Sequence, residues 1–465
     1  MIFNQISWRH IYFLLFFIAL VACGNEPETI KVYITTTPEQ VSSEQSMNKT
    51  VDYQRATQPT ITRRHTSTPT QTASPTATNT PTVTPSFTPS SEPSLLDFVP
   101  PADQLPTLRR SAMGIQVHPN IVEEEWRFLL GEAQRLGFGW IKMQIPWDLL
   151  EPQPGQYDPL FYTYVIRVQD AHVNGFQVLL SFVDAPQWAR PAEAREGFKG
   201  PPADPQQLAN FITAFLNETK PQDRRVAAVE IWNEPNLRDR EWDGVPLDGG
   251  TYMRYFAAGY NAVKAIDPSI IVITAGLAPV GDLDGAVSDR RFLQQMYDAG
   301  LAQYDAKIGV HPYGWGNAPD ERCCIEDRPW GNNPVFFFQD TLYDYIDIIQ
   351  RNGHNTQLWI TEFGWGTYQG VGENGEDISP PPAGAEFFDL ITPQEQAEYT
   401  LRAFEIVQQP PLSDWIGVSI LWNLNFATLP FVVEQRQEQA GYSLYDASGN
   451  PRLVYFYLLV SRRTD

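Results

Sequence analysis

Eight short apolar runs, separated by amphipathic stretches, predict an α/β fold, a (β/α)8 TIM barrel, over residues 111–465. The runs are mostly apolar rather than alternating, which is typical of parallel strands buried on both faces. Acids, amides, histidines and aromatic residues follow directly after the runs, and the carboxyl ends of all strands in such a barrel open onto one face. The expected strands are 113–117, 140–145, 177–182, 227–231, 270–274, 306–310, 358–361 and 416–422.

Helical patterns lie between these runs, for example at 205–219 and 251–266. A further helix is expected to begin after Thr392, with Thr392 as the cap, Pro393 at the first helical position and Glu395 closing a capping box. The alternation of strands with helices is what a parallel barrel requires.

The N-terminus predicts a targeting segment rather than part of the barrel. Arg9 and His10 precede an apolar stretch, 11–21, that is short for a permanent membrane span. The stretch ends in Leu-Val-Ala-Cys-Gly, which resembles a bacterial lipobox. The resemblance implies a signal peptide at 1–22 and a lipid-modified Cys23, which would anchor an exported lipoprotein in a membrane, facing the cell surface or the periplasm. An ordinary signal peptide or an uncleaved anchor is the alternative, and both also imply export.

Residues 23–110 are expected to form a disordered linker. Thr, Ser and Pro dominate the stretch from residue 57 to residue 94, with repeats such as Thr-Pro-Thr. Such a composition favours extended, solvated conformations and builds no apolar core. We expect a stalk that holds the barrel away from the membrane.

The composition of the chain indicates which kinds of ligand and partner are expected. The formal net charge of −22 argues against nucleic acid, whose phosphates would be repelled. The 13 Trp and 20 Tyr suit a protein that stacks aromatic faces on sugar rings. Apart from Cys23, only the adjacent pair Cys323 and Cys324 remains, as a vicinal disulfide or as two free thiols. No His or Cys cluster has metal-ligand spacing, so neither a metal nor a cofactor is expected. The oligomeric state is left open.

Two acidic motifs follow strand runs. Ile-Trp-Asn-Glu-Pro-Asn places Glu234 at the end of the fourth expected strand, and Ile-Thr-Glu-Phe-Gly-Trp places Glu362 at the end of the seventh. The barrel would bring these two carboxyl groups face to face across its open end. Two carboxyl groups so placed are what the cleavage of a glycosidic bond requires.

These residues resemble the (β/α)8 clan A of retaining glycoside hydrolases, from about residue 111 to the end. Asn-Glu-Pro after the fourth strand and a glutamate closing the seventh are the clan's motifs, and His311-Pro312-Tyr313 resembles its His-x-Tyr. Pro186-Gln187-Trp188 and Trp-Asn-Glu-Pro-Asn look nearest to family 39, with families 5 and 42 as neighbours. One departure is Lys142, which stands where many members carry an arginine and which lacks the planar fork of that residue.

The resemblance implies a role for each site residue. Glu234 would be the general acid/base, with a raised pKa, and Glu362 would be the nucleophile. Asn233 would bind the sugar 2-hydroxyl, and Tyr313 would orient Glu362. The remaining candidates for substrate binding or support are His311, Trp422, His118, Trp188 and Lys142. The predicted function is a retaining glycosidase that acts on an extracellular or envelope polysaccharide or oligosaccharide. The alternative is a catalytically silent, surface-tethered barrel that binds glycans.

Overall fold

The computed structural model describes residues 94–220 and 226–465, which contain a parallel sheet of eight strands in the order β6-β5-β4-β3-β2-β9-β8-β7. All eight expected strands are present, with ends that differ from the predicted ones by a few residues at most. The predicted (β/α)8 barrel is therefore confirmed. The strands are β2 (Met113–Gln116), β3 (Trp140–Pro146), β4 (Gln177–Val183), β5 (Ala228–Ile231), β6 (Ile271–Thr274), β7 (Ile308–Val310), β8 (Leu358–Phe363) and β9 (Ile416–Leu421).

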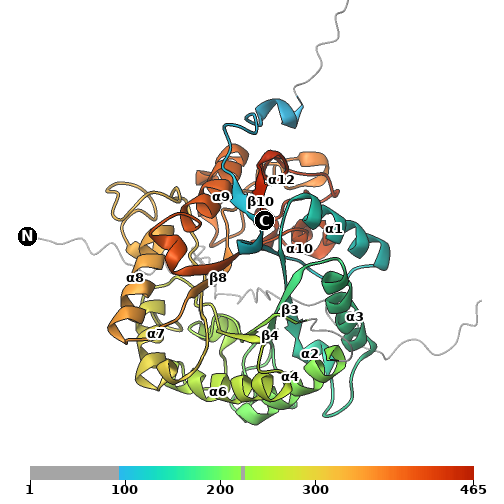
Figure 1. Ribbon diagram of the computed structural model, residues 1–465, viewed down its shortest axis with the longest axis vertical. Helices are drawn as coiled ribbons and strands as arrows, with labels where there is room; N and C mark the ends of the chain where they lie inside the picture. Colours follow the sequence, from blue (N-terminus) through green and yellow to red (C-terminus); the bar gives the residue numbers. More distant parts are fainter. Residues whose placement is uncertain (1–93, 221–225) are drawn as a thin grey trace, which may run out of the picture. The chain divides into compact units, whose positions relative to one another are not determined.

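Backbone hydrogen bonds join the two ends of this sheet. Lys307, which directly precedes β7, forms a parallel bridge with Ile273 of β6. The Thr274 N–H donates to the Lys307 carbonyl over 2.9 Å, and the Lys307 N–H donates to the Val272 carbonyl over 2.9 Å. The sheet thus closes into a barrel, and because its strands are parallel, their carboxyl ends surround one opening (Figure 1).

A helix follows each strand of the barrel and packs on its outer surface, as Figure 1 shows. The helix at 205–219 lies where it was predicted, and the predicted capping box of Thr392 and Glu395 is formed. These outer helices are α1 (Glu123–Arg135), α3 (Pro159–Val173), α4 (Pro205–Thr219), α6 (Gly249–Ile266), α7 (Asp289–Asp298), α8 (Phe338–Arg351), α9 (Pro393–Val407) and α12 (Leu453–Val460).

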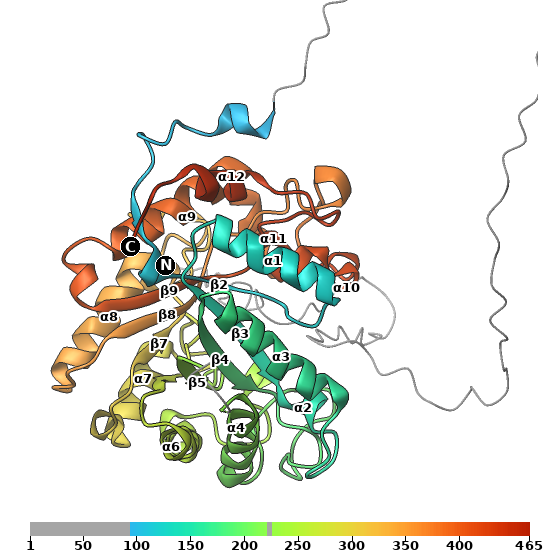
Figure 2. The same ribbon diagram turned by 45° about the vertical axis from the view of Figure 1, so that its right-hand side comes forward.

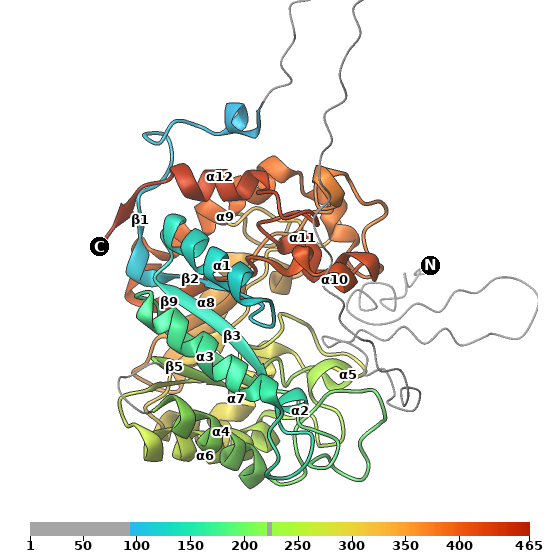
Figure 3. The same cartoon turned by 90° about the vertical axis from the view of Figure 1, so that its right-hand side faces the viewer.

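The loops after the strands carry four short helices, which gather at one end of the barrel in Figure 3. They are α2 (Trp147–Leu150), α5 (Arg238–Glu241), α10 (Pro430–Glu434) and α11 (Gln439–Tyr442). At the opposite end, β1 (Leu108–Arg109) pairs in parallel with β10 (Arg463–Thr464), so the chain enters and leaves the barrel side by side (Figure 2).

Two apolar layers stabilise the barrel. The larger layer lies between the strands and the helices, and the smaller one fills the barrel interior. Because side chains alternate along a strand, the residue two positions after an interior side chain points to the same side. Trp140, Leu179, Ala228 and Trp359 belong to the interior apolar layer. The residues two positions after them are polar and fully buried, and they are, in the same order, Lys142, Ser181, Glu230 and Thr361. A polar layer therefore lies between the apolar plug and the open end.

The predicted signal peptide, the predicted lipidation of Cys23 and most of the predicted linker lie outside the described residues. The described chain begins at Ser94, and Leu108 of β1, within the predicted linker, is fully buried against the barrel. Among the helices of the described ranges, none combines the length and the apolar character that crossing a bilayer would require.

Candidate active site

The open end of the barrel brings five of the predicted residues together. Glu234 follows β5, His311 and Tyr313 follow β7, and Glu362 lies near the end of β8. Lys142 reaches the same place from the middle of β3. Residues far apart in sequence thus meet because their strands are parallel and their carboxyl ends share one face.

The loop that carries Glu234 is held by its own motif. Trp232 and Glu234 have positive φ angles of 74° and 39°, a backbone conformation that few non-glycine residues adopt. The buried Trp232 indole donates to the Glu241 carbonyl over 2.9 Å, and the Glu234 N–H donates to the Gly276 carbonyl over 3.0 Å. Packing and hydrogen bonds therefore impose a backbone geometry that the chain would not adopt alone.

The second asparagine of the motif fixes the loop further. The Asn236 amide donates to the carbonyl groups of Ala278 and Val287 over 2.9 and 3.1 Å, and its oxygen accepts from the Ala278 N–H over 3.0 Å. Asn236 is fully buried and has no contact with the carboxyl groups. Its role in the motif is to position the loop.

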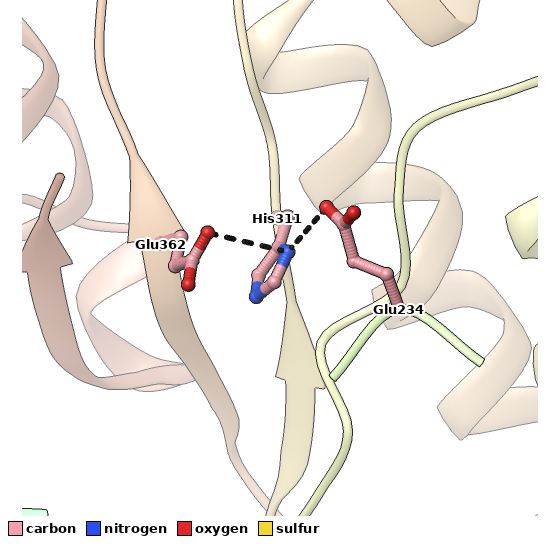
Figure 4. Close-up of side chains that lie close together, drawn as sticks. All are labelled: Glu234, His311 and Glu362. Carbon is pink, nitrogen blue, oxygen red and sulfur yellow. Dashed lines mark hydrogen bonds and ion pairs between the residues drawn. The ribbon is translucent and has the colours of Figure 1, made fainter. Parts of the chain in front are cut away.

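His311 lies between the two glutamates (Figure 4). Its Nδ1 is 3.0 Å from Glu234 Oε1 and 3.9 Å from Glu362 Oε2. Its Nε2 is 3.1 Å from the hydroxyl oxygen of Thr361. The nearest oxygens of the two carboxyl groups lie within 4.8 Å of each other.

Glu362 is surrounded by donors. Lys142 Nζ is 3.0 Å from Oε1, and the Tyr313 hydroxyl donates to Oε2 over 3.1 Å. Burial and the neighbouring carboxylate raise the pKa of Tyr313 well above its usual range, so the phenol keeps its proton and donates it. Burial by itself would lower the pKa of Lys142, but Glu230 and Glu362 outweigh burial and raise it. An ammonium and a phenol thus both donate hydrogen bonds to Glu362.

Glu234 has a different environment, and one prediction about it is wrong. Burial acts to raise the pKa of Glu234, but the hydrogen bond with His311 and the charge of Arg240 outweigh burial, so the pKa is lowered rather than raised. Arg240 Nε lies 3.9 Å from Glu234 Oε2, which has no hydrogen-bond partner among the described residues. Trp232, two residues before Glu234, donates its indole N–H to the Glu241 carbonyl.

Asn233 precedes Glu234, and its side-chain amide has unused hydrogen-bonding capacity among the described residues. Its Nδ2 is 3.5 Å from Glu241 Oε1, and no described residue donates a hydrogen bond to its buried Oδ1. Burial and the charge of Asp184 raise the pKa of Glu241 well above its ordinary value. The amide of Asn233 is therefore weakly held and can bind a hydroxyl group from a ligand.

Aromatic residues form one wall of the site. Trp422 follows β9 and packs against Tyr442 and Tyr313, with ring centroids 4.9 and 6.0 Å away. The same apolar cluster includes Trp315 and Trp330 from the loop after β7, and both pack against Phe387 from the loop after β8. Two long loops thus meet beside Trp422.

The adjacent cysteines lie in the first of these loops and form a disulfide. The N–H of Cys323 donates to Asp340 Oδ2 over 2.7 Å, at the start of α8. Of the two states expected from the sequence, the structure contains the oxidised one.

The structure places two other candidates away from the carboxyl pair. His118 bonds through its backbone to Asn425, and burial lowers its pKa to about 4, so its ring is neutral. Trp188 donates to the Glu151 carbonyl over 2.9 Å and packs edge-on against Trp147. Neither side chain contacts Glu234 or Glu362 in the hydrogen bonds and ring contacts of the described residues.

Three residues of the site were not predicted: Glu230, Arg240 and Glu241. Glu230 interrupts an otherwise apolar strand, and a charge inside a buried run was the signal that could have found it. Arg240 and Glu241 lie on α5, whose position over the site depends on the path of the loop. No pattern in the sequence indicates that path.

Glu234, His311 and Glu362 are the one group in the described ranges whose ligand atoms are close enough to hold a metal ion. Lys142 already lies 3.0 Å from Glu362, and His311 Nδ1 already lies 3.0 Å from Glu234. A cation would have to compete with both contacts. The expectation that the protein needs no metal stays a prediction.

Comparisons with known proteins agree with this architecture. No protein-family model matches the chain, and no curated protein matches it. Solved structures do, including a family 39 glycoside hydrolase from the gut symbiont Bacteroides cellulosilyticus WH2, with 20% identity and a TM-score of 0.54 over 76% of this chain. The chain covers 64% of the length of that protein.

A second similar structure is the GH53 catalytic domain from Ignisphaera aggregans, with 16% identity and a TM-score of 0.52. The match covers 78% of this chain and 99% of that one. At these identities the similarity shows that the proteins share a fold. The chain thus shares a (β/α)8 barrel fold with these two structures.

Gly276 gives a test of how tightly the site is packed. A Cβ atom on Gly276 would lie 2.1 Å from His311 Nε2 and 2.6 Å from the Thr361 hydroxyl, so Gly276→Ala is expected to displace the imidazole ring. Overpacking of this kind costs about 1–3 kcal/mol. Thermal unfolding should show a melting temperature several degrees lower, and a crystal structure of the variant should show the ring moved.

Gly131→Ala is the matched control, because a Cβ on Gly131, in α1, would meet no atom within 4 Å. Its melting temperature should be unchanged or higher. Equal effects of the two substitutions would contradict the packing argument.

Proposed function

We propose that the protein is a retaining glycoside hydrolase that acts on O-glycosidic bonds of an extracellular or envelope polysaccharide or oligosaccharide. The observation that carries the proposal is the separation of the two carboxyl groups, whose nearest oxygens lie within 4.8 Å. Retaining enzymes hold their carboxyl groups about 5–5.5 Å apart, and inverting enzymes roughly 6.5–9.5 Å apart, to admit a water molecule. The spacing supports double displacement.

The environments of the two carboxyl groups support different roles for them. Glu362, bonded to Lys142 and Tyr313, is the nucleophile that attacks the anomeric carbon and forms a glycosyl-enzyme. Glu234 protonates the leaving oxygen and then removes a proton from the attacking water. Its Oε2, which accepts no hydrogen bond from the described residues and lies 3.9 Å from Arg240 Nε, is the oxygen available for that transfer.

Other residues of the site would bind the sugar. Asn233, with a free buried oxygen and a weakly bonded amide, is placed to bind the 2-hydroxyl of the sugar. Trp422 supplies an aromatic face at the wall of the site. His311 supports Glu234 rather than the sugar, because its two nitrogens already bond Glu234 and Thr361.

The decisive experiment compares wild type with Glu234→Gln and Glu362→Gln on a panel of aryl glycosides and polysaccharides. We expect Glu362→Gln to abolish turnover and Glu234→Gln to lower kcat about 10²–10⁴-fold. Proton NMR of the first product should show the anomeric configuration of the substrate.

Hydrolysis that persists in both variants would contradict the assignment of Glu234 and Glu362 as the catalytic carboxyl groups. An inverted first product would overturn double displacement. Binding of a glycan without turnover by the wild-type protein would favour the silent, glycan-binding barrel instead.

The pH dependence follows from the contacts of Glu234. The general acid must be protonated, and because its pKa lies below the ordinary range in the free protein, kcat/KM should fall above acidic pH. His311→Phe removes the hydrogen bond that contributes most to lowering this pKa. The pKa of Glu234 then rises, and the alkaline limb of the kcat/KM profile should move to higher pH.

A pH series of kcat/KM for wild type and His311→Phe measures this shift. His354→Phe is the control, because His354 bonds Tyr297 and the Tyr304 carbonyl, away from the carboxyl pair. A limb that stays in place in His311→Phe would show that another group sets it.

We further propose that the protein works outside the cell as a lipoprotein. The support is the sequence alone: an apolar stretch that ends in Leu-Val-Ala-Cys-Gly, and a Thr/Ser/Pro-rich stretch before the barrel. Cys23→Ala should abolish incorporation of labelled palmitate and release the protein from membranes, as fractionation would show. Ser43→Ala is the control, and labelling that persists in Cys23→Ala would refute the anchor.

A further inference from the structure

The ammonium of Lys142 lies in the polar layer beneath Glu362 and has three acceptors. These are Glu362 Oε1 at 3.0 Å, Glu230 Oε2 at 3.1 Å and the Thr361 carbonyl at 3.1 Å. A lysine ammonium has three N–H donors, so each donor has one partner. Lys142 and Glu230 are both fully buried.

Glu230 is itself held in place by further donors. Its Oε1 accepts from the Gly276 N–H over 3.0 Å, and the Ser181 hydroxyl donates to its Oε2. His311 Nε2 lies 4.0 Å from Oε1, and the charge of Glu230 also acts on the phenol of Tyr252 on α6. The described donors to this carboxylate are Lys142, the Ser181 hydroxyl and the Gly276 N–H, which together fix its position.

The position of Glu230 explains how a lysine can serve beneath the nucleophile. A guanidinium is planar and holds its N–H donors in a fixed geometry, whereas the ammonium of a lysine lies at the end of a flexible side chain that does not fix its direction. A second carboxylate, Glu230, gives the ammonium a fixed partner besides Glu362, and it supplies charge that a buried cation needs. The ion pair leaves one donor directed at Glu362.

We infer that Glu230 is a positioning residue that acts through Lys142, holding its ammonium against the nucleophile Glu362. The inference rests on the proposed function and adds to it a residue that the substrate does not touch. Glu230→Gln should then change the chemical step rather than substrate binding, because the disturbed group lies below Glu362 and away from the sugar.

A double-mutant cycle tests the inference. We expect Glu230→Gln to lower kcat about 10- to 100-fold, as a misplaced reacting group does, with KM changed less than about threefold. In the Lys142→Met background the same substitution should have little further effect, because the group through which Glu230 acts is gone. The inference would be overturned if Glu230→Gln lowered kcat by the same factor in the wild-type and Lys142→Met backgrounds, or if it left kcat unchanged.

A matched variant separates positioning from a merely structural role. The control is Asp289→Asn, because Asp289 of the outer helix α7 is an equally buried carboxylate that accepts hydrogen bonds from Arg290 and Tyr345. Asp289→Asn should lower the melting temperature and leave kcat unchanged. A fall in kcat in Asp289→Asn equal to that in Glu230→Gln would contradict the inference.

Thermal unfolding provides a measurement that needs no substrate. Glu230→Gln leaves the buried ammonium with one carboxylate instead of two, and Lys142→Met leaves the buried Glu230 carboxylate without its cation. Both single variants should therefore melt below wild type, and the double variant should melt above Lys142→Met. Additive losses would overturn the pairing. A wild type inactive on every glycan would refute the proposed function, while this cycle would still decide whether the two residues act together.

Ser181→Ala covers the case in which Glu230→Gln does not fold. It removes one donor to Glu230 and leaves both charges in place. We expect kcat to fall several-fold with KM unchanged, and an unchanged kcat would contradict the inference.

Discussion

A buried ammonium is the feature on which the open end of this barrel depends. Lys142 is fully buried above an apolar plug of Trp140, Leu179 and their neighbours, where an unpaired charge would be strongly destabilising. Glu230 from β5 and Glu362 from β8 approach it from two sides. The ion pairs therefore tie three strands of the barrel together at one point, directly below the site.

The same arrangement separates the two glutamates electrostatically. Glu362 receives an ammonium and a phenol, whereas Glu234 receives an imidazole and, farther away, a guanidinium. Two carboxyl groups of one chemical type thus acquire different environments although their nearest oxygens lie within 4.8 Å of each other. That difference suits the proposed double displacement, in which the two groups have different roles.

His311 connects these two environments. It lies between the carboxyl groups, and its far nitrogen is held by Thr361, the residue that precedes Glu362 in the chain. Gly276 leaves the space that the ring occupies, since any larger residue there would overlap it. The backbone of Gly276 also accepts from the Glu234 N–H and donates to Glu230. One glycine therefore contributes to the position of three side chains of the site.

Much of this molecule was predictable from local patterns. The eight strands, the cap at Thr392 and the meeting of Glu234 with Glu362 follow from the periodicity of apolar residues and from the rule that parallel strands end on one face. The resemblance to clan A implied that Tyr313 lies beside Glu362, as it does in the structure. The partners on loops and inside the barrel were not predictable, because they depend on which strands face each other across the interior and on how α5 folds over the site.

The sequence by itself therefore determined the fold, the pair of carboxyl groups and the side of the barrel on which they lie, since these follow from residue type and periodicity along the chain. Only the tertiary structure decided the lowered pKa of Glu234, the pairing of Lys142 with Glu230 and the distance between the carboxyl groups. Charges interact through space, and their burial and separation are set by residues that lie far apart along the chain.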